Sequence, residues 1–203
     1  YNETNGISIP PTPAIGAVGR VPDVSKMVDI GFRNEGDLIV VIGREQGWLG
    51  QSIYQLMYAE KLEGAPPEVD LADELKAGKL SRALIREGRA SAVHDCSDGG
   101  LLVAIAEMAL AGGIGAELFP YEGKLPSHAI WFGEAQGRYI LAVTPNKAEE
   151  VVERARLLAL PARIIGKVGG DRLSLKGEAF LPLDELGATH EGWLPDYMEN
   201  PLE

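Results

Sequence analysis

One apolar segment constrains the fold of this chain more than any other feature. Leu38, Ile39, Val40, Val41 and Ile42 follow one another without polar interruption, between glycines at positions 36 and 43. Such a run is typical of a strand covered on both faces, because a strand with one solvated face alternates apolar and polar residues. We therefore expect a strand over residues 37–42 inside a sheet that helices cover on both sides.

The rest of the chain mixes helical and strand patterns. Leucines spaced through residues 71–85 predict an amphipathic helix that ends near Gly88. Residues 99–110 are apolar on nearly every side except at Glu107, which favours a buried helix, and residues 52–60 predict a short one. Asn146 and Glu149 resemble a capping box at the start of another helix, and a short helix is expected near Trp193.

Further strands are predicted over residues 28–32, 90–94, 116–119, 129–132, 138–143, 163–168 and 172–175. The last two are expected to form a hairpin through Gly169 and Gly170. Together these patterns predict an α+β fold with α/β layering, a mixed sheet flanked by helices.

Composition limits the function. The net charge is −11, from 30 acidic and 19 basic residues, which argues against a nucleic-acid partner because such binding needs clustered Lys and Arg. No apolar run approaches the roughly 18 residues that cross a bilayer, and no signal-peptide pattern opens the chain, so a cytoplasmic location is expected. The single cysteine, Cys96, cannot form an internal disulfide.

The strongest candidate site is the segment from His94 to Gly100, which joins a predicted strand to the buried helix. A helix N-terminus presents unpaired N–H groups, glycines let a phosphate approach the backbone, and Asp95 and Asp98 are able to chelate magnesium. A structural role explains the same residues equally well. Asp98 or Ser97 would then cap the helix, and the glycines would allow tight packing.

Two further segments have weaker signals. Residues 47–52 form a glycine-containing turn between strand and helix, which lacks the Lys and the glycine spacing of a P-loop. In residues 133–138, Glu134 and Gln136 are two apart and are expected to face one side together, although a solvated turn explains them as well. Three histidines and one cysteine offer neither zinc-site spacing nor a nucleophile–base pair.

Several motifs occur together in one order: Tyr1-Asn2-Glu3-Thr4, Ile9-Pro10-Pro11-Thr12-Pro13-Ala14-Ile15-Gly16, Gly50-Gln51-Ser52-Ile53-Tyr54, His94-Asp95-Cys96-Ser97-Asp98-Gly99-Gly100-Leu101 and Ala106-Glu107-Met108-Ala109. In this combination the chain resembles the synthetase subunit of phosphoribosylformylglycinamidine synthase. That family is built from two fused halves, each with an A and a B domain similar to aminoimidazole ribonucleotide synthetase.

The resemblance implies a domain organisation. Residues 1–34 would be the last strands of a truncated A-type domain, 35–185 a B-type C-terminal domain, and 186–203 a tail. The chain opens at Tyr1 without an initiator Met, as expected of a piece of a longer protein. The family's Gly-Asn-Val-Ser-Leu stretch, which binds ATP, metal and substrate, is expected immediately before Tyr1.

The resemblance also implies an activity, that of a C–N ligase in purine synthesis. ATP phosphorylates the amide oxygen of formylglycinamide ribonucleotide, and ammonia from a glutaminase subunit then displaces phosphate, with Mg²⁺ required. The implied partners are that glutaminase subunit, a small accessory subunit and the remaining N-terminal domains of the same polypeptide. The fragment alone is expected to be inactive.

The implied site residues of this chain are auxiliary, and none is catalytic. ATP or substrate would contact Tyr1, Gly50, Ser52, His94, Ser97, Gly99, Gly100, Glu134 and Gln136, and Mg²⁺ would contact Asp95 and Asp98. These residues are counterparts, by internal pseudo-symmetry, of the first-half site. His94 stands where that half has Gln and Ala135 where it has Ser, so a degenerate second site is expected.

Two alternatives stay open. Beside the interpretation as the C-terminal part of this ligase, the chain would be a non-catalytic packing or auxiliary nucleotide-binding module, or part of a related enzyme like aminoimidazole ribonucleotide synthetase. Exposed strand edges within residues 1–32 also suggest that the fragment homodimerises.

Overall fold

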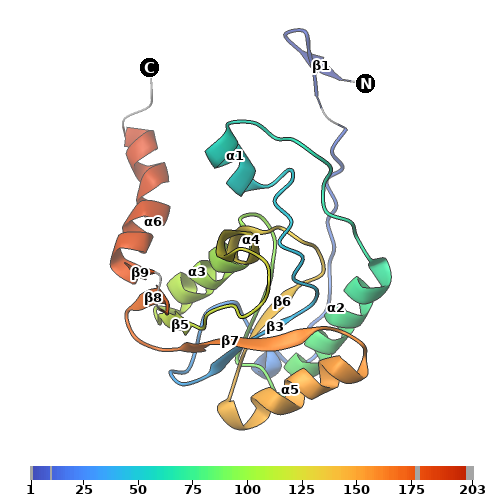
Figure 1. Ribbon diagram of the computed structural model, residues 1–203, viewed down its shortest axis with the longest axis vertical. Helices are drawn as coiled ribbons and strands as arrows, with labels where there is room; N and C mark the ends of the chain where they lie inside the picture. Colours follow the sequence, from blue (N-terminus) through green and yellow to red (C-terminus); the bar gives the residue numbers. More distant parts are fainter. Residues whose placement is uncertain (1, 10, 177–178, 200–203) are drawn as a thin grey trace.

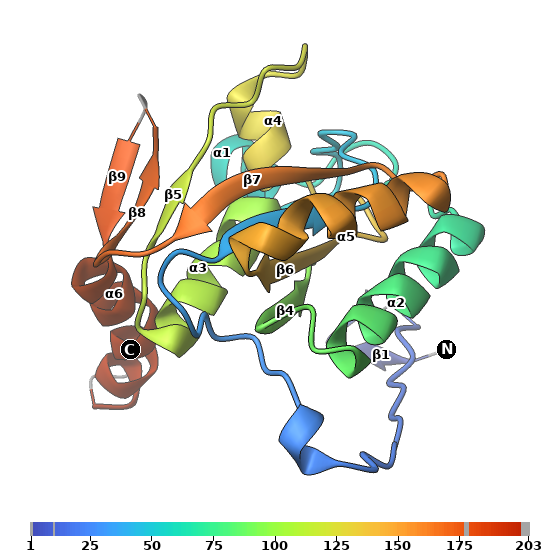
Figure 2. The ribbon, with the colours of Figure 1, turned by 90° about the horizontal axis from the view of Figure 1, so that it is seen from below.

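The computed structural model describes residues 2–9, 11–176 and 179–199. A mixed seven-stranded sheet in the order β4-β6-β3-β7-β5-β8-β9 forms its centre, with helices on both faces (Figures 1 and 2). The strands of this sheet are β3 (Leu38–Ile42), β4 (Ala92–Asp95), β5 (Ala116–Leu118), β6 (Tyr139–Val143), β7 (Ala162–Val168), β8 (Arg172–Leu175) and β9 (Ala179–Pro182). The helices are η1 (Val24–Lys26), α1 (Ile53–Ala59), α2 (Leu71–Arg86), α3 (Gly100–Gly112), α4 (Ser127–Phe132), α5 (Pro145–Leu157) and α6 (Leu183–Glu199).

The apolar run Leu38–Ile42 is the strand β3, as predicted. It pairs antiparallel with β6 on one side and with β7 on the other, and Val40 lies opposite Leu141 and Ile164. Alternate residues of β3 then enter two separate cores. Ile39 and Val41 pack toward α3 and α4, whereas Val40 and Ile42 pack toward α2 and α5.

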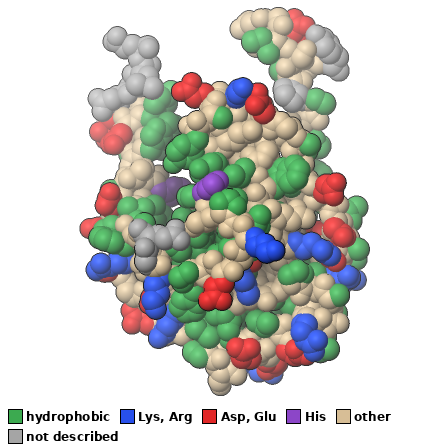
Figure 3. All heavy atoms as spheres, viewed as in Figure 1, with side chains coloured by type: hydrophobic (Ala, Val, Ile, Leu, Met, Phe, Trp, Pro, Cys, Tyr) green, Lys and Arg blue, Asp and Glu red, His purple; other side chains and the backbone are tan. Residues whose placement is uncertain are grey.

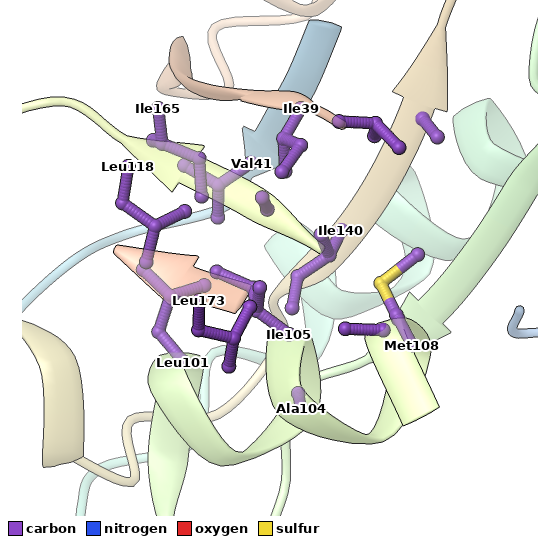
Figure 4. Packing of buried hydrophobic residues seen from close by; sticks show 14 of the residues in the cluster. Ile39, Val41, Leu101, Ala104, Ile105, Met108, Leu118, Ile140, Ile165 and Leu173 are labelled. Carbon is purple, nitrogen blue, oxygen red and sulfur yellow. The ribbon is translucent and has the colours of Figure 1, made fainter. Parts of the chain in front are cut away.

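Helix α3 supplies most of the first core. Figure 4 shows Leu101, Ile105 and Met108 of this helix directed toward the strand residues, among them Ile140 and Leu173. The prediction of a buried helix is therefore confirmed, because α3 is apolar nearly all round and lies beneath the sheet next to α4. The α+β fold with a mixed sheet flanked by helices is confirmed as well.

Two predicted strands and one predicted hairpin are wrong. Residues 28–32 are not a strand, since Phe32 N donates to Met108 O at the end of α3 instead of joining the sheet. Residues 129–132 belong to the helix α4, whose first turn closes with bonds from Ala129 N and Ile130 N to Pro126 O. Strands β7 and β8 form no hairpin, because β5 lies between them and pairs parallel with β8.

The predicted capping box is also wrong. Helix α5 begins with Pro145 at its first position, and its N-cap Thr144 makes no side-chain bond to a helix N–H group. The Thr144 hydroxyl instead donates to Asn146 Oδ1 at 2.9 Å. Proline at this position needs no cap for its own nitrogen, which explains why the helix starts earlier than predicted.

The N-terminal arm projects from the sheet, whereas α6 packs against β9 and α3. Strands β1 (Glu3–Thr4) and β2 (Ile7–Ser8) form a separate two-stranded hairpin at the tip of an extended N-terminal arm (Figure 1). At the other end α6 is longer than the short helix expected there, and Trp193, Leu194 and Met198 on it are exposed. Among the described helices, none combines the length and the apolar character that a bilayer span requires.

Candidate functional site

The three candidate segments of the sequence meet at one place. The loop before α1, the turn before α3 and the loop between α4 and β6 contact one another through backbone atoms. Glu134 N donates to Trp48 O at 2.9 Å, Cys96 N donates to Arg138 O at 2.9 Å, and Gly100 packs against the backbone of Phe132. We call residues 47–52, 94–100 and 133–138 together the three-loop site.

Glu134 is the centre of the three-loop site. Its Oε1 accepts a hydrogen bond from Ile53 N, at the start of α1, and another from Gly99 N, just before α3, each at 2.8 Å. One carboxylate therefore satisfies backbone donors at the beginnings of two helices, where such donors lack partners within the helix. Negative charge at a helix N-terminus is also favourable because of the helix dipole.

Because Glu134 accepts these two hydrogen bonds, removing its side chain is expected to destabilise the folded chain. Glu134→Ala is expected to lower the free energy of unfolding by about 1–3 kcal/mol, because the part-buried N–H group of Gly99 and the exposed N–H group of Ile53 both lose their acceptor. Glu134→Gln keeps an oxygen at the same place and is expected to lose less than half as much. Urea denaturation measures both variants. An equal loss of unfolding free energy in both variants would show that the acceptor oxygen does not contribute to stability.

The glycines of the turn serve packing. Gly99 and Gly100 both have φ of +76°, a left-handed conformation that favours glycine. A Cβ on Gly100 would lie 2.7 Å from Gly133 O, and one on Gly99 would lie 2.6 Å from a methyl carbon of Val103. The structural alternative for these two residues therefore has direct geometric support, since protein atoms already occupy the space next to them.

The polar residues of the same turn are spread out. Asp95, Ser97 and Asp98 are exposed, and the side chain of Asp98 makes no hydrogen bond or ion pair with any described residue. His94 is largely buried, with its Nε2 3.2 Å from Glu107 Oε2 and its Nδ1 3.4 Å from Asp95 Oδ1. The Nδ1 forms no hydrogen bond within the described part of the chain.

The predicted magnesium ligands lack a third partner. Within residues 2–9, 11–176 and 179–199, no three side chains of His, Cys, Asp or Glu are grouped so that they could hold a metal ion. Mg²⁺ prefers six oxygens and often takes several from phosphates or water. Asp95 and Asp98 alone therefore do not fit a metal site made by the described part of this chain.

Gln136 lies apart from Glu134. It is exposed and lines a small polar cleft with Gly43, Asp73 and Glu74, whereas Glu134 is turned toward α1 and α3. The expectation that both face one side together is wrong, because residues 133–138 form a turn and lack the two-residue alternation of a strand.

In the loop before α1, residues 47–52, the N-cap residue Ser52 forms hydrogen bonds through its side chain. Ser52 is fully buried at the N-cap of α1, where its hydroxyl accepts from Gln55 N and donates to Leu49 O. A Cβ on Gly50 would lie 2.9 Å from Ala65 O, so glycine lets the following connection approach. Tyr1, the remaining predicted contact, lies outside the described residues.

Sequence patterns missed Arg138, which organises the third loop. Its side chain is only 2% exposed, and it donates to Ala135 O at 2.9 Å and to Gly133 O at 2.5 Å. These bonds fold the loop that carries Glu134 and Gln136. The only signal in the sequence is a single charged residue directly before the apolar strand at residues 139–143.

Cys96 is sealed beneath the three-loop site. It is 8% exposed, and burial raises the pKa of its thiol to about 11. Because only the thiolate attacks, we expect a thiol reagent at pH 8 to label the native chain roughly 100-fold more slowly than the chain in urea. Mass spectrometry counts the label on this single cysteine. Equally fast labelling of both states would contradict the burial.

Comparison with known proteins gives the family. A family model described as AIR synthase related protein, C-terminal domain, matches residues 34–177. The chain is 51% identical over 202 residues to phosphoribosylformylglycinamidine synthase subunit PurL of Methylocella silvestris. This match covers 100% of the chain. The chain spans only 27% of that relative's length.

Solved structures agree in fold. Thermotoga maritima PurL complexed with FGAR superposes with a TM-score of 0.65 and 21% identity, over 79% of this chain and 29% of that one. The same protein complexed with ATP gives a TM-score of 0.62 and 21% identity, over 80% of this chain and 27% of that one. At this identity the likeness concerns the fold alone.

Proposed function

The chain belongs to the family of AIR synthase related proteins, as their C-terminal domain, and on that premise we propose that it is the C-terminal part of the synthetase subunit of phosphoribosylformylglycinamidine synthase. The observation that carries the proposal is the 51% identity to the Methylocella silvestris PurL subunit along the whole chain. The Parvibaculum lavamentivorans subunit, at 52% over 200 residues, supports the same assignment.

The complete enzyme would be an ATP-dependent C–N ligase that acts on formylglycinamide ribonucleotide. The relatives of known structure were studied with FGAR and with ATP, which supports this substrate pair. The glutaminase and small accessory subunits would be its partners, in keeping with a solved Thermotoga maritima assembly named PurLQS. ATP and glutamine-derived ammonia are cytoplasmic supplies, so we place the enzyme there.

This chain would act as a scaffold in that enzyme. The side chains of Glu134 and Arg138 form hydrogen bonds with backbone groups of the three-loop site. The space beside Gly100 is occupied by backbone atoms of Phe132 and Gly133. Groups already engaged in this way hold loops in place but transfer no proton or phosphate. In the proposal, residues 1–34 complete an A-type domain and the catalytic groups belong to the remainder of the longer polypeptide.

An exposed apolar surface supports the second candidate, a packing module. Helix α1 exposes Leu56, Met57 and Tyr58, and α6 exposes Trp193 and Leu194. Figure 3 shows hydrophobic side chains over this end of the molecule, between the projecting N-terminal arm and α6. Large exposed apolar surfaces mark sites of protein contact, which in this proposal are contacts with the rest of the same polypeptide.

A chimaera tests the proposed function. The C-terminal 27% of the Methylocella silvestris subunit is replaced by this chain, and ATP- and ammonia-dependent turnover of formylglycinamide ribonucleotide is measured. We expect turnover within about tenfold of the parent enzyme, because about half of the replaced residues are identical. A soluble chimaera without turnover, beside an active parent, would overturn the proposal.

Calorimetric titration separates the scaffold from an auxiliary nucleotide site. The 203-residue chain is titrated with Mg-ADP, and the titration is repeated with Asp95→Ala. Saturable binding that the variant loses would support a second nucleotide site at the turn before α3. No binding at millimolar nucleotide would support the packing module.

A further inference from the structure

A groove far from the three-loop site collects positive charge. It has a volume of about 460 Å³ and lies between the N-terminal segment around η1 and the C-terminal end of α2. Figures 1 and 2 both show this segment passing beside α2. The groove, which we call the basic groove, is lined by Arg20, Val21, Pro22, Asp23, Lys26, Met27, Val28, Arg82, Ile85 and Arg86.

Four of the lining side chains are cations and one is a carboxylate. None of Arg20, Lys26, Arg82 and Arg86 has a carboxylate oxygen of a described residue within 4.0 Å of its side-chain nitrogens. This is unexpected for a chain with 30 acidic and 19 basic residues. Acidic residues are abundant in the chain, yet Asp23 is the one carboxylate among the residues that line this groove.

The one carboxylate is already engaged. Asp23 Oδ1 accepts from Ser25 N at 3.0 Å and from Ser25 Oγ at 2.6 Å, which caps η1. These bonds hold the pKa of Asp23 below its usual range, and the charge of Lys26 adds to the effect. Asp23 therefore fixes the backbone of the segment, and its carboxylate forms no ion pair within 4.0 Å with any of the four cations.

The arrangement of the cations carries a cost. Arg82 and Arg86 are four residues apart on α2, so their guanidinium groups lie on one face of the helix, and like charges at this spacing repel each other. Arg20 and Lys26 face them from the other wall. A bound anion with several negative oxygens would remove this repulsion and supply acceptors that match the guanidinium forks.

The walls also offer apolar surface. Val21 is 60% exposed and Met27 is 63% exposed, although both line a concave site. Small-molecule sites are usually clefts of about 300–1,000 Å³ with apolar walls and a few convergent polar groups. The basic groove has this size and this composition, and it is too small to hold a folded partner.

We propose that the basic groove binds a small molecule that carries at least two phosphate groups, with Arg82 and Arg86 on one side of the phosphates and Arg20 and Lys26 on the other. The site is independent of the three-loop site and shares no residue with it. Binding here would order the N-terminal segment against α2, because the ligand would connect cations from both.

Calorimetry with inorganic pyrophosphate tests the proposal. The 203-residue chain is titrated at low ionic strength without Mg²⁺, and one saturable site is expected. The double variant Arg82→Gln/Arg86→Gln is expected to bind at least about tenfold more weakly and Lys26→Gln about threefold, because the double variant loses two charge-assisted contacts to the phosphates and the single variant loses one. These side chains are exposed and form no ion pair with another residue that the structure describes, so their replacement is expected to leave the fold intact.

Lys79→Gln is the matched control for Lys26→Gln. Lys79 is exposed on α2, the helix that carries Arg82 and Arg86, makes no ion pair with a described residue and does not line the groove. It is expected to change the affinity less than twofold. Absence of saturation up to about 10 mM pyrophosphate, or an equal weakening by Lys79→Gln, would overturn the proposal.

A second measurement needs no variant. Phenylglyoxal modifies exposed arginines, and mass spectrometry reports the rate at each position. Pyrophosphate is expected to slow the modification of Arg20, Arg82 and Arg86 at least fivefold and to leave Arg156 unchanged, because Arg156 is paired with Glu153 outside the groove. Equal rates with and without pyrophosphate would overturn the site even if a variant failed to fold.

Discussion

Gly100→Ala is expected to lower the free energy of unfolding by about 2–5 kcal/mol, one of the two largest effects predicted for this chain. The backbone at Gly100 has φ of +76°, which costs an L-residue about 1–2 kcal/mol. The added Cβ would also lie 2.7 Å from both Gly133 O and Phe132 C, and forcing apart a packed region costs about 1–3 kcal/mol more. Urea denaturation followed by circular dichroism measures the loss.

Gly113→Ala is the matched control for this effect. Gly113 follows the other end of the same helix with φ of +66°, and a Cβ there would have no heavy atom within 4 Å. It carries the backbone cost alone, about 1–2 kcal/mol. A loss at Gly100 no larger than the loss at Gly113 would mean that the contact between α3 and the loop after α4 tolerates a methyl group.

Local patterns predicted those parts of the fold that depend on neighbouring residues. The run at residues 38–42 gave the correct strand because burial on both faces leaves it no polar position. Helices α2 and α3 were predicted for a similar reason, since one is amphipathic and the other apolar all round. In each case the segment itself carries enough information to specify its structure.

Where distant contacts decide the structure, the patterns failed. Ala129, Ile130 and Trp131 are consecutive buried residues, which resembles a buried strand, yet they lie in a helix enclosed by the sheet, α3 and the loops. Strand β8 follows β7 after a glycine turn, but it pairs with β9 and with β5, and β5 lies more than fifty residues earlier. Spacing along the chain does not contain either fact.

In the candidate site, too, local patterns identified the segments, whereas their contacts with one another depend on residues far apart in the chain. Each of its three segments was found from its glycines and polar residues, but nothing local indicates that they meet. Glu134 makes its two bonds across 81 and 35 residues. The glycines of the turn were expected to leave room for a phosphate. The space beside them is instead occupied by the side chain of Val103 and by the backbone at the end of α4. The structure therefore explains most of these residues as parts that hold loops together, which is what a scaffold requires.

Trp131→Ala is expected to destabilise the chain by about 3–5 kcal/mol, because it removes the largest fully buried side chain from the core between the sheet and α3. The Nε1 of Trp131 has no hydrogen-bond partner among the described residues. Trp131→Phe therefore deletes volume without breaking a hydrogen bond, and about half of the loss is expected. Trp193→Ala is the control, since Trp193 is 65% exposed on α6 and its removal is expected to cost less than about 1 kcal/mol. Equal losses at the two positions would show that α4 is not a core helix.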